Sequence, residues 1–375
     1  MNKPIRILHV VQRMEAGGTQ ALLMNIYRNI DRTKIQFDFL VEYPNKEFYD
    51  DEILKLGGKI YYSTVRTDFN ILKFKKQLEN ILRQNPDYKI MHVHASNIGY
   101  ICFKTAKKMG VHTRIAHAHS NGSVHDAKYF LRWILRKLFT LYATDYYACS
   151  KEAGEYFFKN KDFKVLKNAI NSEKFIYNEK QRIKMREELN IENNFVVGHI
   201  GRFKPEKNHK FLIEIFSEIK RKKNNAKLLL IGSGDLENAI KKQVKELNLE
   251  QNVIFLGNRT DVNDLYQAMD IFIFPSLFEG LGIVAIEAQA SGTPIVCSNN
   301  LPPEIEISSI CKKLSLNETA EAWADEAIKL AEDNKSKQNM QQQVINAGFD
   351  LLDIVNKIQD FYIKSYTKHR SKYEK

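Results

Sequence analysis

Two glutamates in the second half of the chain have the spacing to hold a polar ligand. Glu279 comes shortly after an apolar run that ends at Phe274, and Glu287 lies in the small-residue segment 283–290, which has helical spacing. Their separation corresponds to about two helical turns, so we expect both carboxylates on one side, roughly ten ångströms apart along the axis. That distance is the span from a sugar ring to the ribose of one nucleotide-sugar.

The elements around these glutamates form a βαβ unit. An apolar run at residues 271–274 suits a strand buried on both faces of a parallel sheet. A loop with two glycines, the helix at 283–290 and a second strand-like run, PIVC, follow. Glutamates near a helix start also complement the helix dipole. Glu287, however, lies on an apolar helix, where an unpaired carboxylate is costly, and this favours a polar ligand on that face.

A pair of cations follows another expected strand, residues 195–200. Arg202 and Lys207 stand five positions apart in a loop that begins with Gly201. A planar guanidinium and a mobile ammonium in such a loop can clamp a diphosphate. Solvated surface cations are the alternative interpretation, which we prefer for Lys204.

A histidine marks the end of an expected strand at residues 113–118. His119 holds the position that faces the ligand crevice of a doubly wound sheet, although a strand-end histidine is often only structural, and His117 lies close by. After the first expected strand, residues 5–11, the pair Gly17-Gly18 either lets backbone N–H groups approach phosphates or forms a tight turn before a helix.

These motifs, in this order, resemble retaining glycosyltransferases of GT-B type, family 4. The resemblance rests on E-x7-E from Glu279, G-R-x4-K from Gly201 and the strand-end His119, and extends over nearly the whole chain. It implies an α/β protein with two Rossmann-like, doubly wound parallel-sheet domains facing a central cleft. Thr19-Gln20 departs from the Ala-Glu that is common after the glycine pair.

The resemblance also assigns roles to single residues. It makes His119 and Glu279 the catalytic residues, with His119 orienting the sugar. The ribose is expected on Glu287, the diphosphate on Arg202 and Lys207, and the nucleobase beside Arg259. The residues expected to bind the donor are Gly17, Gly18, Arg202, Lys207, Arg259, Gly280, Leu281, Gly282, Ile283 and Glu287. We expect no metal and no cofactor, because no D-x-D motif occurs.

A length of 375 residues predicts two domains. We expect an N-terminal acceptor domain at 1–175, a charged linker at 172–190 and a C-terminal donor domain at 190–349. The helix expected at 350–372 has an apolar side with which to pack back on the first domain.

Composition and charge limit the class of protein and its expected location in the cell. The net charge is +12, with a basic region at 101–150 and an acidic one at 251–350. No secretory signal or membrane span is recognisable, so a cytoplasmic protein is expected. The amphipathic stretch 127–142 predicts either a packed helix or one lying on an anionic membrane. Nucleic acid is not expected as a partner, and the four cysteines predict free thiols.

Together these observations predict transfer of a sugar from a nucleotide-diphosphate sugar, most simply a UDP-sugar, to a saccharide acceptor that is lipid-linked. The sequence is most similar to enzymes of bacterial capsular and exopolysaccharide biosynthesis. Alternatives are a lipopolysaccharide or teichoic-acid glycosyltransferase, a nucleotide-sugar 2-epimerase of GT-B type, and a non-enzymatic sugar-nucleotide binder.

Overall fold

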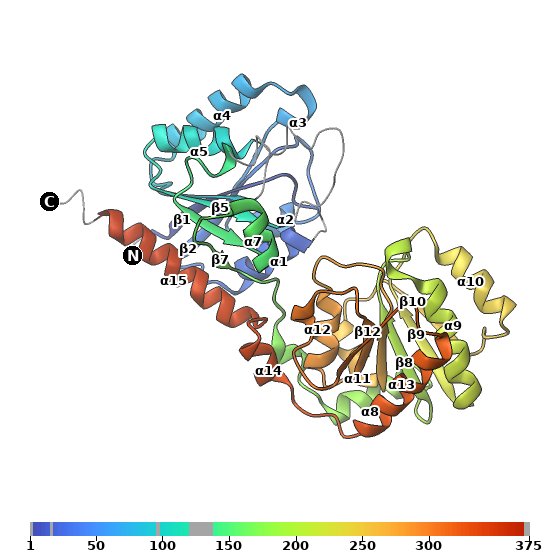
Figure 1. The fold of residues 1–375 in the computed structure, drawn as a ribbon. Helices are drawn as coiled ribbons and strands as arrows, with labels where there is room; N and C mark the ends of the chain where they lie inside the picture. Colours follow the sequence, from blue (N-terminus) through green and yellow to red (C-terminus); the bar gives the residue numbers. More distant parts are fainter. Residues whose placement is uncertain (1–2, 16–17, 95–97, 120–137, 371–375) are drawn as a thin grey trace. The chain divides into compact units, whose positions relative to one another are not determined.

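The computed structural model describes all residues except 1–2, 16–17, 95–97, 120–137 and 371–375 (Figure 1). The chain folds into two compact units. The first unit combines Met1–Asn168 with Leu351–Lys375, and the second is Ala169–Asp350. Most of the segment 127–142 lies outside the described residues, and so does Gly17.

The first unit contains a seven-stranded sheet in which all neighbours are parallel, in the order β3-β2-β1-β4-β5-β6-β7. Of its central strands, β4 is buried along its whole length and β1 is buried from Ile7 onwards, as expected for a parallel sheet that is covered on both faces. The strands are β1 (Ile5–Val11), β2 (Ile35–Val41), β3 (Ile60–Tyr62), β4 (Ile90–His94), β5 (Thr113–Ala118), β6 (Asp145–Ala148) and β7 (Lys164–Val165).

Helices connect these strands, and the last helix of the chain returns to them. In α15, the side chains of Ile354, Ile358 and Tyr362 are buried, and the helix contacts α1 and β4. Side chains cap the N-termini of two of the other helices: Asn70 caps α4 and Ser150 caps α7. The helices described in this unit are α1 (Gly18–Asn29), α2 (Asp50–Lys55), α3 (Val65–Asp68), α4 (Ile71–Gln84), α5 (Gly99–Lys108), α7 (Lys151–Phe158) and α15 (Leu351–Arg370).

The second unit contains a six-stranded parallel sheet in the order β10-β9-β8-β11-β12-β13. Burial of both faces of β11 explains why its sequence is apolar without interruption. Phe272 and Phe274 pack into one hydrophobic cluster, whereas Ile271 and Ile273 pack into another, so both faces of the strand are covered. The strands are β8 (Phe195–Ile200), β9 (Ala226–Ile231), β10 (Val253–Gly257), β11 (Ile271–Phe274), β12 (Ile295–Ser298) and β13 (Cys311–Leu314).

The helices of the second unit include a segment that we expected to be a linker. Residues 172–190 form η1 and α8, and both belong to this unit. Arg182 and Arg186 fix α8 by binding the Asp270 carboxylate and backbone carbonyls of the α11 end. The helical elements are η1 (Ser172–Phe175), α8 (Glu179–Glu188), η2 (Pro205–Lys207), α9 (His209–Lys222), α10 (Glu237–Glu246), α11 (Val262–Ala268), α12 (Ile283–Ala290), η3 (Pro303–Ile305), α13 (Ala320–Asp333) and α14 (Gln341–Asn346).

Two further expectations concern cysteines and membranes. All four cysteines are free thiols, as expected. In the part of the chain that the structure describes, no helix combines the length and the apolar character needed to cross a bilayer.

Candidate active site

The order of strands in the second unit places two loops side by side. The chain proceeds from β8 to β9 and β10 in one direction, and from β11 to β12 and β13 in the other. β8 and β11 are neighbours, with Val197 opposite Ile271. In doubly wound sheets, ligands bind at such a switch point, outside the carboxyl ends of the strands. The loops that leave β8 and β11 carry Arg202, Lys207 and Glu279.

An ion pair joins these two loops. Lys207 Nζ lies 2.6 Å from Glu279 Oε1, and the two side chains are only 17% and 12% exposed. Backbone contacts hold the loops in register, since the N–H of Leu277 donates to the carbonyl of Glu206 at 2.8 Å. Asn208 adds a bond from its side-chain amide to the carbonyl of Pro275 at 3.1 Å. The structure therefore brings two of the predicted site residues into direct contact.

Arg202 lies in the same loop as Lys207 but is exposed. The glycine turn after β9 supports the backbone of this loop, since the N–H of Phe203 donates to the carbonyl of Ser233 at 3.0 Å. Gly232, at φ +132°, approaches so closely that a Cβ there would lie 2.2 Å from the carbonyl oxygen of Gly201. The G-S-G turn is thus explained by loop packing, and the exposed guanidinium of Arg202 is left accessible to an anion.

The loop after β11 ends in a left-handed glycine that begins α12. Gly282 has φ +80°, which is strained for residues with a Cβ. Gly280 is exposed, whereas Leu281 and Ile283 are half-buried. The first N–H groups of a helix lack intrahelical partners and carry a partial positive charge, so the start of α12 suits oxygen ligands.

Glu287 lies one turn into α12, in a desolvated environment. The Tyr266 hydroxyl is 3.1 Å from Glu287 Oε2 and 3.0 Å from the carbonyl of Val284. Burial raises the pKa of Glu287 to about 7, and the hydrogen bond from Tyr266 opposes this rise. Near neutral pH, this carboxyl is therefore poised between its protonated and ionised forms.

As expected, Glu279 lies in the loop before the helix and Glu287 lies inside it. The helical spacing by which we related their two carboxylates, however, does not apply. Only Glu287 is helical, because α12 begins at Ile283 and the left-handed Gly282 breaks any continuation towards Glu279. Two turns of helix therefore do not separate the carboxylates. Glu279 instead takes its position from the loop and from Lys207.

The other predicted residues lie elsewhere. Arg259 follows β10 and is engaged by the carboxylate of Asp261, with Nε 2.7 Å from Oδ1. Gly18 is the first residue of α1, after β1 in the first unit. His119 directly follows β5 in the first unit, and its Nε2 lies 2.8 Å from His94 Nδ1. Burial lowers the pKa of His119 to about 3, so its imidazole is neutral.

Two kinds of residue escaped the sequence analysis. Tyr266, which contacts Glu287, is an ordinary helix residue in the sequence and gave no signal. His94 belongs to H-x-H at 92–94, and a second H-x-H occurs at 117–119. Because alternate residues of a strand share one face, these two patterns could have indicated a histidine cluster.

Two parallel-sheet α/β units, with seven and six strands, form the GT-B fold of glycosyltransferases. Residues 180–347 match the family described as "Glycosyl transferases group 1". The chain is 30% identical to the Bacillus subtilis protein named "Putative glycosyltransferase EpsF" over 383 residues, which cover 98% of each protein. The chain therefore belongs to the group 1 glycosyl transferases.

Two further comparisons extend this assignment. The chain is 26% identical to an Escherichia coli UDP-Gal:alpha-D-GlcNAc-diphosphoundecaprenol alpha-1,3-galactosyltransferase, covering 91% of this chain and 95% of the relative. Among solved structures, Anabaena HepE in complex with UDP superimposes with a TM-score of 0.77 at 19% identity. The match covers 95% of this chain and 99% of HepE, and at this identity the likeness concerns the fold.

Proposed function

We propose that this protein is a retaining, family 4 glycosyltransferase that moves a sugar from a UDP-sugar to a lipid-linked saccharide in capsular or exopolysaccharide biosynthesis. The name of the E. coli relative states a UDP-galactose donor, a diphosphoundecaprenol-linked acceptor and an alpha linkage. The HepE structure contains UDP. Both findings support a uridine nucleotide as the donor. The name of the E. coli relative also supports an acceptor that is carried on a polyprenol.

The observation that carries the proposal is the grouping of charges at the switch point of the second unit. Lys207 and Glu279 are paired at 2.6 Å and largely buried, whereas Arg202 in the same loop is exposed. A diphosphate bound by Arg202, Lys207 and the N-terminus of α12 would have its charge neutralised by fixed donors. No metal is required by this set of groups.

The remaining groups suit the ends of the donor. Glu287 accepts ribose hydroxyls, and Glu279 accepts sugar hydroxyls together with the backbone of residues 280–283. Arg259 lies beside the nucleobase once it leaves Asp261. For the first unit, the resemblance to family 4 gives Gly17-Gly18 the role of offering backbone N–H groups to the donor, and gives His119 the role of orienting the sugar.

The chemistry follows from what these groups can do. Stabilisation of the departing diphosphate by Arg202 and Lys207 lowers the barrier for cleavage of the sugar–phosphate bond. The departing phosphate oxygen takes the proton of the acceptor hydroxyl on the same face, so the anomeric configuration is retained. His119, whose imidazole is neutral, orients the sugar through a hydrogen bond, and we assign it no nucleophilic role.

The test has two stages. A thermal-shift panel of UDP-, GDP-, ADP- and TDP-sugars, with and without EDTA, names the donor. At 100 times the dissociation constant, a ligand should stabilise the protein by about 2.7 kcal/mol. The selected donor is then incubated with polyprenyl-diphosphate-linked monosaccharides, and the product linkage is read by NMR.

We expect a UDP-sugar hit that EDTA does not abolish, followed by a product with retained anomeric configuration. An inverted linkage would refute retention. A UDP-sugar epimer formed without acceptor would establish the 2-epimerase alternative instead, and binding without any turnover would establish a sugar-nucleotide binder.

A further inference from the structure

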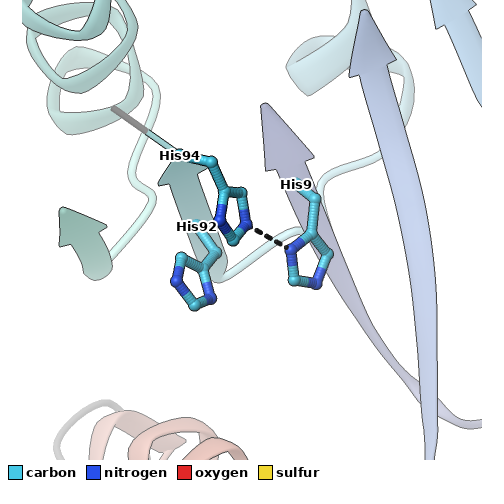
Figure 2. A group of neighbouring side chains, drawn as sticks. All are labelled: His9, His92 and His94. Atoms are coloured by element: carbon cyan, nitrogen blue, oxygen red, sulfur yellow. Dashed lines mark hydrogen bonds between the residues drawn. The ribbon is translucent and has the colours of Figure 1, made fainter. Parts of the chain in front are cut away.

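A cluster of five histidines lies inside the first unit. His9 comes from β1, His92 and His94 from β4, His117 from β5, and His119 directly follows β5. In the order of the sheet, β1, β4 and β5 are neighbours, so alternate residues of these strands place all five rings on one face. Figure 2 shows three of them, His9, His92 and His94, with the hydrogen bond that joins His9 to His94.

Three of these rings form a continuous hydrogen-bonded chain. His9 Nδ1 lies 3.0 Å from His94 Nε2, and His94 Nδ1 lies 2.8 Å from His119 Nε2. The centroids of His9 and His94 are 5.3 Å apart, with planes inclined by only 17°. His94 and His119 are similarly separated, at 5.1 Å. In both pairs it is the short distance between one nitrogen of each ring, 3.0 Å and 2.8 Å, that identifies an N–H···N hydrogen bond.

The same histidines include two triads that could hold a metal ion, His9-His92-His94 and His94-His117-His119. The contacts favour hydrogen bonding over metal binding. The facing nitrogens of His9 and His94 are already in donor–acceptor contact.

Each contact in the chain holds one proton, so the tautomers of the three rings are linked. If His94 carries its proton on Nδ1, it donates to His119 and accepts from His9, and all three rings are Nδ1–H tautomers. If His94 carries the proton on Nε2, all three become Nε2–H tautomers. Within the described part of the chain, the buried Nε2 of His9 has no partner. A buried N–H without an acceptor is among the rarest states of a polar group, which favours the first arrangement.

We propose that His9 and His94 hold His119 as the neutral Nδ1–H tautomer, so that His119 presents a fixed hydrogen-bond donor at Nδ1. His94 and His9 are then positioning residues, and His119 alone meets the ligand. The assignment of the ligand oxygen to the transferred sugar rests on the proposed function. The tautomer of His119 does not depend on that function. Burial lowers the pKa values of His9, His94 and His119, which agrees with an uncharged chain.

A second chain in the same cluster supplies a matched control. The Tyr362 hydroxyl lies 2.7 Å from His92 Nδ1, and His92 Nε2 lies 3.1 Å from His117 Nδ1. This chain includes neither His94 nor His119. Tyr362→Phe therefore removes one buried hydrogen bond from the cluster without interrupting the chain to His119.

The test is ring-nitrogen NMR of the full-length protein with ¹⁵N-labelled histidine, in which protonated and bare nitrogens are distinguished by their shifts. We expect Nδ1–H signals for His9, His94 and His119 in the wild type. His94→Phe should release His119 to a mixture of tautomers. His94→Asn should preserve the Nδ1–H form, because the asparagine amide can donate to His119 Nε2, and Tyr362→Phe should leave it unchanged.

An Nε2–H tautomer at His119 in the wild type would overturn the proposal, as would shifts of metal-bound nitrogens together with stoichiometric metal in the purified protein. So would His119 signals in His94→Phe identical to those of the wild type. The wild-type spectrum by itself tests the tautomer of His119, even if a variant fails to fold. Turnover should fall about tenfold in His94→Phe, the effect of one lost hydrogen bond, with UDP affinity unchanged. If no transferase activity exists but the tautomer pattern holds, only the proposed function fails.

Discussion

The ammonium of Lys207 lies 2.6 Å from the carboxylate of Glu279, although the two residues are far apart in the sequence. The contact exists because β8 and β11 are adjacent, so the loops that leave them share one edge of the sheet. Each charge fixes the other in a largely desolvated position. A substitution at one of these residues must therefore affect the other, and the next two predictions separate their roles.

Lys207→Met should weaken UDP binding by about tenfold or more, because a charge-assisted hydrogen bond contributes about 1.5–3 kcal/mol. Lys204→Met is the matched control, since Lys204 lies in the same loop and we assign it no role in the site. Calorimetric titration with UDP measures both. Equal affinities of the Lys207 variant and the wild type would refute the diphosphate assignment.

Glu279→Gln should leave UDP affinity unchanged or increase it, because the charge of Lys207 is no longer shared with a carboxylate. Turnover of the UDP-sugar should fall about tenfold or more if the lost carboxylate binds the sugar more strongly in the transition state. Steady-state kinetics and UDP titration on one preparation measure the two effects, with Glu206→Gln as a control from the neighbouring loop. A loss of UDP affinity matching that of Lys207→Met would instead make Glu279 a support for Lys207 only.

Much of the fold could be predicted because its signals are local. Apolar runs bounded by turn residues predicted β1, β5, β8 and α12 with the bounds that the structure has, or nearly so. The helix α8 was missed for a physical reason: Arg182 and Arg186 fix it through Asp270 and backbone carbonyls, so it needs no apolar stripe.

The contacts within the site could not be predicted from single segments. His9 stands opposite His92 in the β1–β4 register, and His94 stands opposite His117 in the β4–β5 register. Registers depend on which strands become neighbours, and this information is not present in any one strand. The contact between Tyr266 and Glu287 likewise depends on how α11 packs on α12.

The raised pKa of Glu287, about 7, predicts pH dependence in two measurements. In the folded protein this carboxyl holds its proton to a higher pH than in the unfolded chain. The free energy of unfolding of the wild type, relative to Glu287→Gln, should therefore fall as the pH rises from about 4.5 to 7, and level off above that range. Paired denaturant titrations of the two proteins across this pH range measure the difference in their free energies of unfolding. A difference that does not change with pH would mean that the carboxyl ionises normally.

Nucleotide binding should change in the opposite sense. Ribose hydroxyls donate hydrogen bonds, so the ionised Glu287 is the better acceptor. UDP affinity of the wild type should rise between pH 6 and pH 8, and Glu287→Gln should remove this dependence. A pH dependence that persists in the variant would assign the titration to another group.

Gly282→Ala tests whether the left-handed turn before α12 is required. At φ +80° an alanine costs about 1–2 kcal/mol, and its Cβ would lie 3.2 Å from the Phe274 ring. Thermal unfolding should therefore shift downwards by roughly 2–8 °C for a unit of this size. Gly280→Ala is the control in the same loop, because nothing lies within 4 Å of a Cβ there and its φ is not positive. If Gly282→Ala melts at the same temperature as Gly280→Ala, the turn relaxes without cost, and the start of α12 is not a fixed platform for the donor.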